Sequence, residues 1–135
     1  MRSAFLEQNS GATAGIKKKV MDVNAAITLT NDDSGKVYML SATGGTVAIT
    51  LPTALEDGVY YKFIVEEETP SNAITIAAGS AIISLVMKDA GGNASNSTAG
   101  TQVSNLIIGT SAQKGDYINL MAAGGEWVGE CLSSI

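Results

Sequence analysis

The chain has no histidine, a single cysteine, two prolines and few aromatic residues. Without histidine, a Ser-His-Asp triad, a Cys-His pair and a zinc site built on imidazole are all excluded. One thiol cannot form a disulfide within the chain, so the disulfide framework of small secreted domains is excluded as well. We interpret that thiol, Cys131, as a small hydrophobic residue buried in the last strand.

Long apolar runs are also missing from the sequence. No stretch approaches the roughly 20 apolar residues of a membrane span, and residues 1–8 lack the apolar centre of a secretory signal. We therefore expect a protein that is made and used as a soluble chain, with no membrane partner and no cofactor. Its 135 residues are enough for one domain with its own core.

What the chain does contain is a repeated strand pattern. Similar phrases occur as Ala26-Ile27-Thr28-Leu29, Ala48-Ile49-Thr50-Leu51 and Ala73-Ile74-Thr75-Ile76. Alternation with period two places Ile on one face of a strand and the Thr hydroxyl on the other. The phrases begin 22 and 25 residues apart, with different turns between them. We therefore interpret them as strands of one sandwich and not as stacked identical units.

Short apolar segments separated by Gly, Asp and Asn clusters continue this pattern to the C-terminus. They predict an all-β domain over residues 25–135, a compact antiparallel β-sandwich or barrel of about eight or nine short strands. Asp57-Gly58 and the segment 122–126 are hairpin signals. The expected strands are 25–30, 36–41, 46–51, 59–66, 72–77, 81–87, 103–108, 117–121 and 127–132.

Charge is divided unevenly along the chain. The net charge of −5 combines +3 in residues 1–19 with −8 in the remainder. A basic segment rich in Gly, Ser, Ala and Thr ahead of an acidic body predicts a flexible N-terminal arm over residues 1–24 that orders on a partner surface. The docking residues expected in this arm are Arg2, Phe5, Leu6, Lys17, Lys18 and Lys19.

The alternative for this segment is a disordered tail whose lysines are merely solvated. Nucleic acid is not the expected partner, because the body is acidic and three clustered lysines make a weak electrostatic footprint. A phosphate-binding P-loop is excluded, since the spacing of Gly11 and Gly15 is wrong and no Gly-Lys-Ser/Thr follows.

Residues 89–101 form a low-complexity segment that is too long for a hairpin turn. We expect it to face solvent or to lie at an oligomer contact. The residues singled out there are Gly91, Gly92, Asn93 and Asn96.

Carboxylates are the remaining candidates for catalysis, and we expect no enzyme. Glu66 and Glu68 would share one face where a strong strand ends, but a charged rim that discourages edge-to-edge pairing is the better interpretation. Asp32-Asp33 lacks the alternating ligand pattern of a calcium loop, so a turn is expected there and no metal site. Aromatic residues in the strands leave a sugar-stacking site open, although Trp127 is expected to fill the core.

A set of motifs runs in a fixed order through residues 25–130. It comprises 27–30 (ITLT), 33–36 (DSGK), 49–52 (ITLP), 58–65 (GVYYKFIV), 74–76 (ITI), 115–120 (GDYINL) and Trp127. This order resembles the small β domains of tailed-bacteriophage virions, which occur in capsid decoration (cement) proteins and as modules of tail fibres. The resemblance covers about three quarters of the chain.

The resemblance implies a structural virion protein, typically a homotrimer, with no catalytic residues. The sequence has no coiled-coil heptads and no collagen-like repeat of a fibre shaft, and it does have a basic arm. We therefore expect a decoration protein on the outer capsid surface of the virion, bound to the major capsid protein and to copies of itself. The alternative is a tail-fibre, receptor-binding or carbohydrate-binding β domain.

Overall fold

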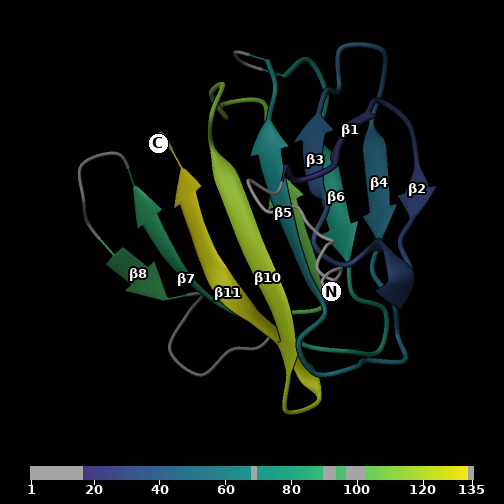
Figure 1. Cartoon of the computed structure of the whole chain (residues 1–135). Coiled ribbons are helices and arrows are strands. Elements are labelled where there is room, and N and C mark those ends of the chain that lie inside the picture. The colour runs from purple at the N-terminus through teal and green to yellow at the C-terminus, as the bar shows by residue number, and fades with distance from the viewer. Residues whose placement is uncertain (1–16, 68–69, 90–93, 97–102, 134–135) are drawn as a thin grey trace.

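The computed structural model describes residues 17–67, 70–89, 94–96 and 103–133. In these ranges the chain forms two β-sheets, of seven and four strands, and one short 3-10 turn, η1 (Asn31–Asp33). The two layers can be followed in Figure 1. The predicted all-β sandwich is therefore confirmed, although the described strands are more numerous than the eight or nine expected.

The larger sheet has the strand order β1-β3-β5-β10-β11-β7-β8. Its strands are β1 (Val20–Val23), β3 (Val37–Leu40), β5 (Tyr60–Val65), β7 (Ile83–Asp89), β8 (Ala94–Asn96), β10 (Tyr117–Ala123) and β11 (Glu126–Ser133). The smaller sheet has the order β2-β4-β6-β9. Its strands are β2 (Ile27–Thr28), β4 (Val47–Thr50), β6 (Ile74–Ala77) and β9 (Asn105–Ile108).

From β1 to β6 the chain alternates between the two sheets, one strand in each. Parallel neighbours need a long crossover, and here the strand in the opposite sheet supplies it. The pairs β1–β3, β3–β5, β2–β4 and β4–β6 are accordingly parallel, as is β11–β7. The expectation of an antiparallel sandwich is therefore wrong for this half of the chain. The predicted hairpin at Asp57-Gly58 is wrong as well, because β4 and β5 lie in different sheets.

The three Ala-Ile-Thr phrases lie side by side in the smaller sheet. Ile27 pairs with Ile49, and Ile49 pairs with Ile76. The third phrase is thus displaced by two residues, which keeps the same side chains on the same face because the strand period is two. The unequal spacings of 22 and 25 residues are absorbed by the connections between sheets. The phrases are strands of one sandwich, as predicted, but they also pair side by side in parallel, so the expectation that unequal spacing excludes stacking was wrong.

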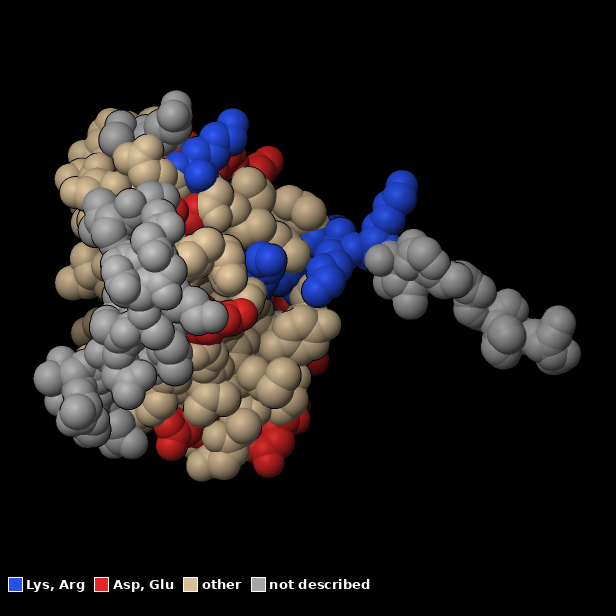
Figure 2. Space-filling model, turned by 90° about the vertical axis from the view of Figure 1, so that its left-hand side faces the viewer, with Lys and Arg blue, Asp and Glu red and all other residues tan. Residues whose placement is uncertain are grey.

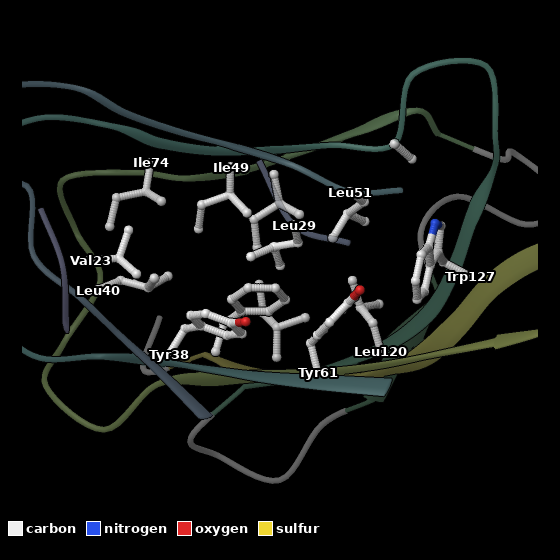
Figure 3. Close-up of a cluster of buried hydrophobic side chains, with 14 of the residues drawn as sticks. Val23, Leu29, Tyr38, Leu40, Ile49, Leu51, Tyr61, Ile74, Leu120 and Trp127 are labelled. Atoms are coloured by element: carbon white, nitrogen blue, oxygen red, sulfur yellow. The ribbon is translucent and has the colours of Figure 1, made fainter. Parts of the chain in front are cut away.

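The core fills the space between the two sheets (Figure 3). Trp127 is fully buried at the start of β11 and packs against Tyr61 with a ring centroid distance of 5.6 Å. This confirms that Trp127 fills the core. The largest fully buried side chains are Trp127, Tyr38, Tyr61, Phe63, Leu29, Leu40, Ile49, Leu51, Ile74, Ile76, Ile83 and Leu120.

The C-terminal half uses a hairpin, as the sequence predicted for 122–126. β10 and β11 are antiparallel, with Ala123 paired to Glu126. Gly124 and Gly125 between them have φ angles of 65° and 84°. Two consecutive positive φ angles make the tight turn whose twist matches a hairpin, and glycine adopts them without steric cost.

Two predicted boundaries need correction. Residues 20–23, assigned to the arm, form β1, and Val23 belongs to the core. The hydrophobic signal of this strand is only four residues long, which is why it was missed. Residues 94–96, assigned to a loop, form β8, which pairs with β7. Gly91, Gly92 and Asn93 lie outside the described residues, and Asn96 is the β8 residue paired with Val86.

Candidate docking surface

The basic segment Lys17–Lys19 is exposed and leads directly into β1, at one edge of the seven-stranded sheet. The backbone carbonyl of Lys19 accepts a hydrogen bond of 2.9 Å from the amide of Val37. The end of the basic segment is thereby fixed to the sheet. The other predicted docking residues, Arg2, Phe5 and Leu6, lie outside the described part of the chain.

Lys18 projects across the outer face of the sheet toward β5. Its Nζ lies 5.6 Å from the centroid of the Tyr60 ring, within the range of a cation–π interaction. Gly35 lies beside this ring and donates its amide to the carbonyl of Tyr60 at 2.8 Å. A Cβ at this glycine would lie 3.4 Å from the Tyr60 hydroxyl, and its φ is +88°. Glycine therefore suits both the backbone and the space between Lys18 and Tyr60.

A second lysine–tyrosine contact of the same kind lies in the middle of this outer face. Lys62 Nζ lies 5.0 Å above the centroid of the Tyr117 ring on the neighbouring strand. Tyr60 and Tyr117 are the two outward-facing aromatic residues of the large sheet, whereas Tyr38, Tyr61 and Trp127 are buried. A lysine ammonium group thus lies over each outward-facing tyrosine ring of the large sheet.

The one ion pair among the described residues joins Lys36 Nζ to Asp33 Oδ1 at 2.6 Å. The hydrogen bond from Lys36, together with one from the Thr30 amide, holds the pKa of Asp33 below its ordinary value. Asp32-Asp33 thus belongs to the capped turn η1, as expected. In Figure 2 several lysine side chains gather midway down the right-hand side, and carboxylates lie mostly nearer the upper and lower ends.

The carboxylates considered for catalysis are not brought together. Glu66 is exposed just beyond β5, and Glu68 lies outside the described residues. Glu67 accepts hydrogen bonds from the Ala42 amide at 2.6 Å and from the Ser41 hydroxyl at 3.0 Å. Its carboxylate therefore ties the end of β5 to the end of β3. In the described ranges no cluster of three or more His, Cys, Asp or Glu side chains could hold a metal ion.

Cys131 is half-buried in β11 and packs against the core. Burial, followed by the negative charge of Asp116, raises the pKa of its thiol. A raised pKa disfavours the thiolate, which is the nucleophilic form. Cys131 thus lies in the last strand against the core, as expected, but it is half-buried and not fully buried.

No protein-family model matches the chain, and a search of curated proteins returned no match. The helical content of the described residues is a single 3-10 turn, so this part of the chain has no helix that could cross a membrane.

Proposed function

We propose that this chain is a structural virion protein that decorates the outer surface of a phage head and binds the major capsid protein through its N-terminal arm. The observation that carries the proposal is the position of Lys17–Lys19. The three lysines are exposed, and they end at a backbone hydrogen bond that fixes Lys19 to the sheet. An arm that begins at a fixed point on a rigid body can reach a neighbouring surface without being confined to the body's own face.

The proposed mechanism is additive binding by several arms. A homotrimer, as the phage resemblance implies, would present three arms to the shell at once. Linked arms bind with an effective concentration set by their tether, so their combined affinity exceeds that of one arm. Ordering each arm costs conformational entropy, so a single arm is expected to bind poorly. The shell would gain stability from the bridged coat subunits.

Charge reversal of the basic segment tests this function. The triple variant Lys17→Glu/Lys18→Glu/Lys19→Glu should lose binding to undecorated heads of the phage that encodes the chain, measured by co-sedimentation. Lys114 is an exposed lysine in the turn before β10, so Lys114→Glu is the matched control and should bind as the original chain does. Equal binding by the triple variant would contradict the arm mechanism.

Multi-angle light scattering should give the mass of a trimer, and a monomer at high concentration would contradict the additive model.

A further inference from the structure

The strand register places three rows of side chains across the outer face of the seven-stranded sheet. One row contains Tyr60, Met121 and Val128, which are paired across β5, β10 and β11. When the pairing of β1, β3 and β5 is continued by two residues toward the N-terminus, Lys18 lies opposite Gly35, and Gly35 lies opposite Tyr60. Lys18 and Gly35 therefore extend this row to the edge of the sheet. The basic segment is therefore continuous with the first row of the face.

The second and third rows run parallel to the first. The second contains Val20, Val37, Lys62, Asn119 and Glu130. The third contains Asp22, Met39, Ile64, Tyr117 and Leu132. Apolar side chains thus predominate in the third row, and the second row carries the cation of Lys62 at its middle.

Exposed apolar surface is concentrated on this face. Four large hydrophobic side chains are exposed among the described residues, and Val20 (57%), Tyr60 (40%) and Met121 (45%) are three of them. Met39, Ile64 and Val128 on the same face are half-buried. A contiguous exposed apolar patch rimmed by polar groups marks an interaction site in soluble proteins.

The outer face of the four-stranded sheet has a different composition. It presents Thr28, Ala48, Thr50 and Thr75, which are small, with Ile107 as its one exposed large hydrophobic side chain. Both sheets have an outer face, but only that of the larger sheet combines aromatic, methionine and lysine side chains. The contrast indicates that the composition of the larger face is not a general property of this fold.

Charge decides what kind of partner fits the face. Lys18 and Lys62 both lie on the part of the face formed by β1, β3 and β5. This part also contains one carboxylate, that of Asp22 in the edge strand β1. Glu130 lies farther along, on β11, where its Oε1 accepts a hydrogen bond from the Asn119 amide group at 3.4 Å. The ammonium groups of Lys18 and Lys62 contact tyrosine rings and form no ion pair with a described carboxylate. Their charge is therefore complementary to an acidic surface.

We propose that this face is a second part of the capsid-docking surface, and that it binds a region of the coat protein where carboxylates surround apolar side chains. This inference rests on the proposed function and names the chemistry of the surface to which the arm leads. We name the surface the Lys–Tyr face; its residues are Lys18, Val20, Tyr60, Lys62, Tyr117 and Met121.

The face binds in two ways at once. The tyrosine rings and Met121 supply apolar area that leaves water on docking, and Tyr is among the residues that most often dominate interface energies. Each lysine holds its ammonium group over a tyrosine ring, where a partner carboxylate that approaches the ring can pair with it. Because Lys18 belongs both to the arm and to the first row, the arm and the face contact the same partner surface and act as linked sites.

Three variants of the full-length chain test the Lys–Tyr face by co-sedimentation with undecorated heads of the encoding phage. Tyr60→Ser/Met121→Ser should weaken binding about tenfold or more. Lys62→Gln should weaken it about threefold and reduce its dependence on NaCl concentration. Ile107→Ser removes an even more exposed apolar side chain from the opposite sheet and should leave binding unchanged. Thermal unfolding midpoints of all variants should match that of the original chain.

The outcomes separate this inference from the proposed function. Loss of binding with the Lys17–Lys19 charge reversal, but normal binding by Tyr60→Ser/Met121→Ser, would overturn the Lys–Tyr face and leave the arm mechanism standing. Failure of the original chain to bind the heads would overturn both. If Tyr60→Ser/Met121→Ser instead abolishes self-association in sedimentation velocity runs, the face is a contact between copies of this chain and the inference is wrong.

Discussion

Tyr60 and Tyr61 are adjacent in β5 and have opposite environments. Tyr61 is 1% exposed, contacts Trp127 and donates its hydroxyl to the Thr30 carbonyl at 2.6 Å. Tyr60 is 40% exposed and carries Lys18 over its ring. Because successive side chains of a strand point to opposite faces, one tyrosine stabilises the core and the next is available to a partner. The inner and outer faces of the same sheet should therefore respond differently to substitution.

Replacing the side chains of Trp127 and Val128 by alanine should give the largest difference in stability between the two faces. Trp127 is fully buried on the inner face, whereas Val128 is half-buried on the outer face. Trp127→Ala should lower the free energy of unfolding by about 3–5 kcal/mol, through lost burial and a residual cavity. Val128→Ala should cost less than about 1.5 kcal/mol, because part of its side chain already contacts water. Urea unfolding followed by far-UV circular dichroism measures both, and equal losses would contradict the assignment of the faces.

Gly129 tests how closely β11 approaches β10. A Cβ at this position would overlap the backbone carbonyl of Asn119, and backbone of a central strand cannot move without disturbing its neighbours. Gly129→Ala should therefore lower the free energy of unfolding by roughly 1–3 kcal/mol. Gly44 has open space around its Cβ position and no positive φ, so Gly44→Ala is the matched control and should be close to neutral. A neutral Gly129→Ala would show that the two strands are farther apart than described.

The buried tyrosines predict a loss of stability at alkaline pH. Burial, with the nearby charge of Asp33 as the smaller cause, raises the pKa of Tyr38 to about 12, and burial raises that of Tyr61 as well. The folded state thus retains a proton that the unfolded chain releases near the ordinary pKa of 10. Their contribution to stability is complete below pH 10 and is lost as pH rises through the folded-state values.

Urea unfolding from pH 9 to 12, with tyrosinate absorbance followed in parallel, measures this loss. Tyr38→Phe should reduce the fall in stability above pH 10, because the buried phenol that would ionise on unfolding is removed. Tyr60→Phe on the outer face is the comparison variant and should retain the fall. An unchanged pH profile in Tyr38→Phe would contradict the predicted linkage.

Alternation in the sequence was sufficient to group the side chains that share a strand face, but not to say which face is inward. In 59–66 it groups Tyr61, Phe63 and Val65, and the structure shows that all three are buried. The positions of tight turns with glycine, such as Gly124-Gly125, followed from the same local rules. The short strand β1 was not identified, because its four residues gain stability from pairing with β3 and contact with the core. Such contacts between distant residues leave little local pattern.

Only half of the proposed docking surface was predicted from the sequence. The Lys17–Lys19 cluster stands out by composition, so the arm was predicted. Lys62 was not singled out, because its significance depends on Tyr117, more than fifty residues away, and on the register of β5 with β10. The only sequence signal was its outward position between two buried aromatic residues in β5.

For this protein, local sequence determined the class of fold, the faces of individual strands and the basic character of the N-terminal segment. These properties depend on side-chain alternation and composition over a few residues. Tertiary structure alone decided that the chain alternates between two sheets, that the Ala-Ile-Thr phrases stack in parallel, and that Lys18 lies over Tyr60. These features depend on pairing between strands that are distant in the chain, and pairing is selected by the packing of the whole core.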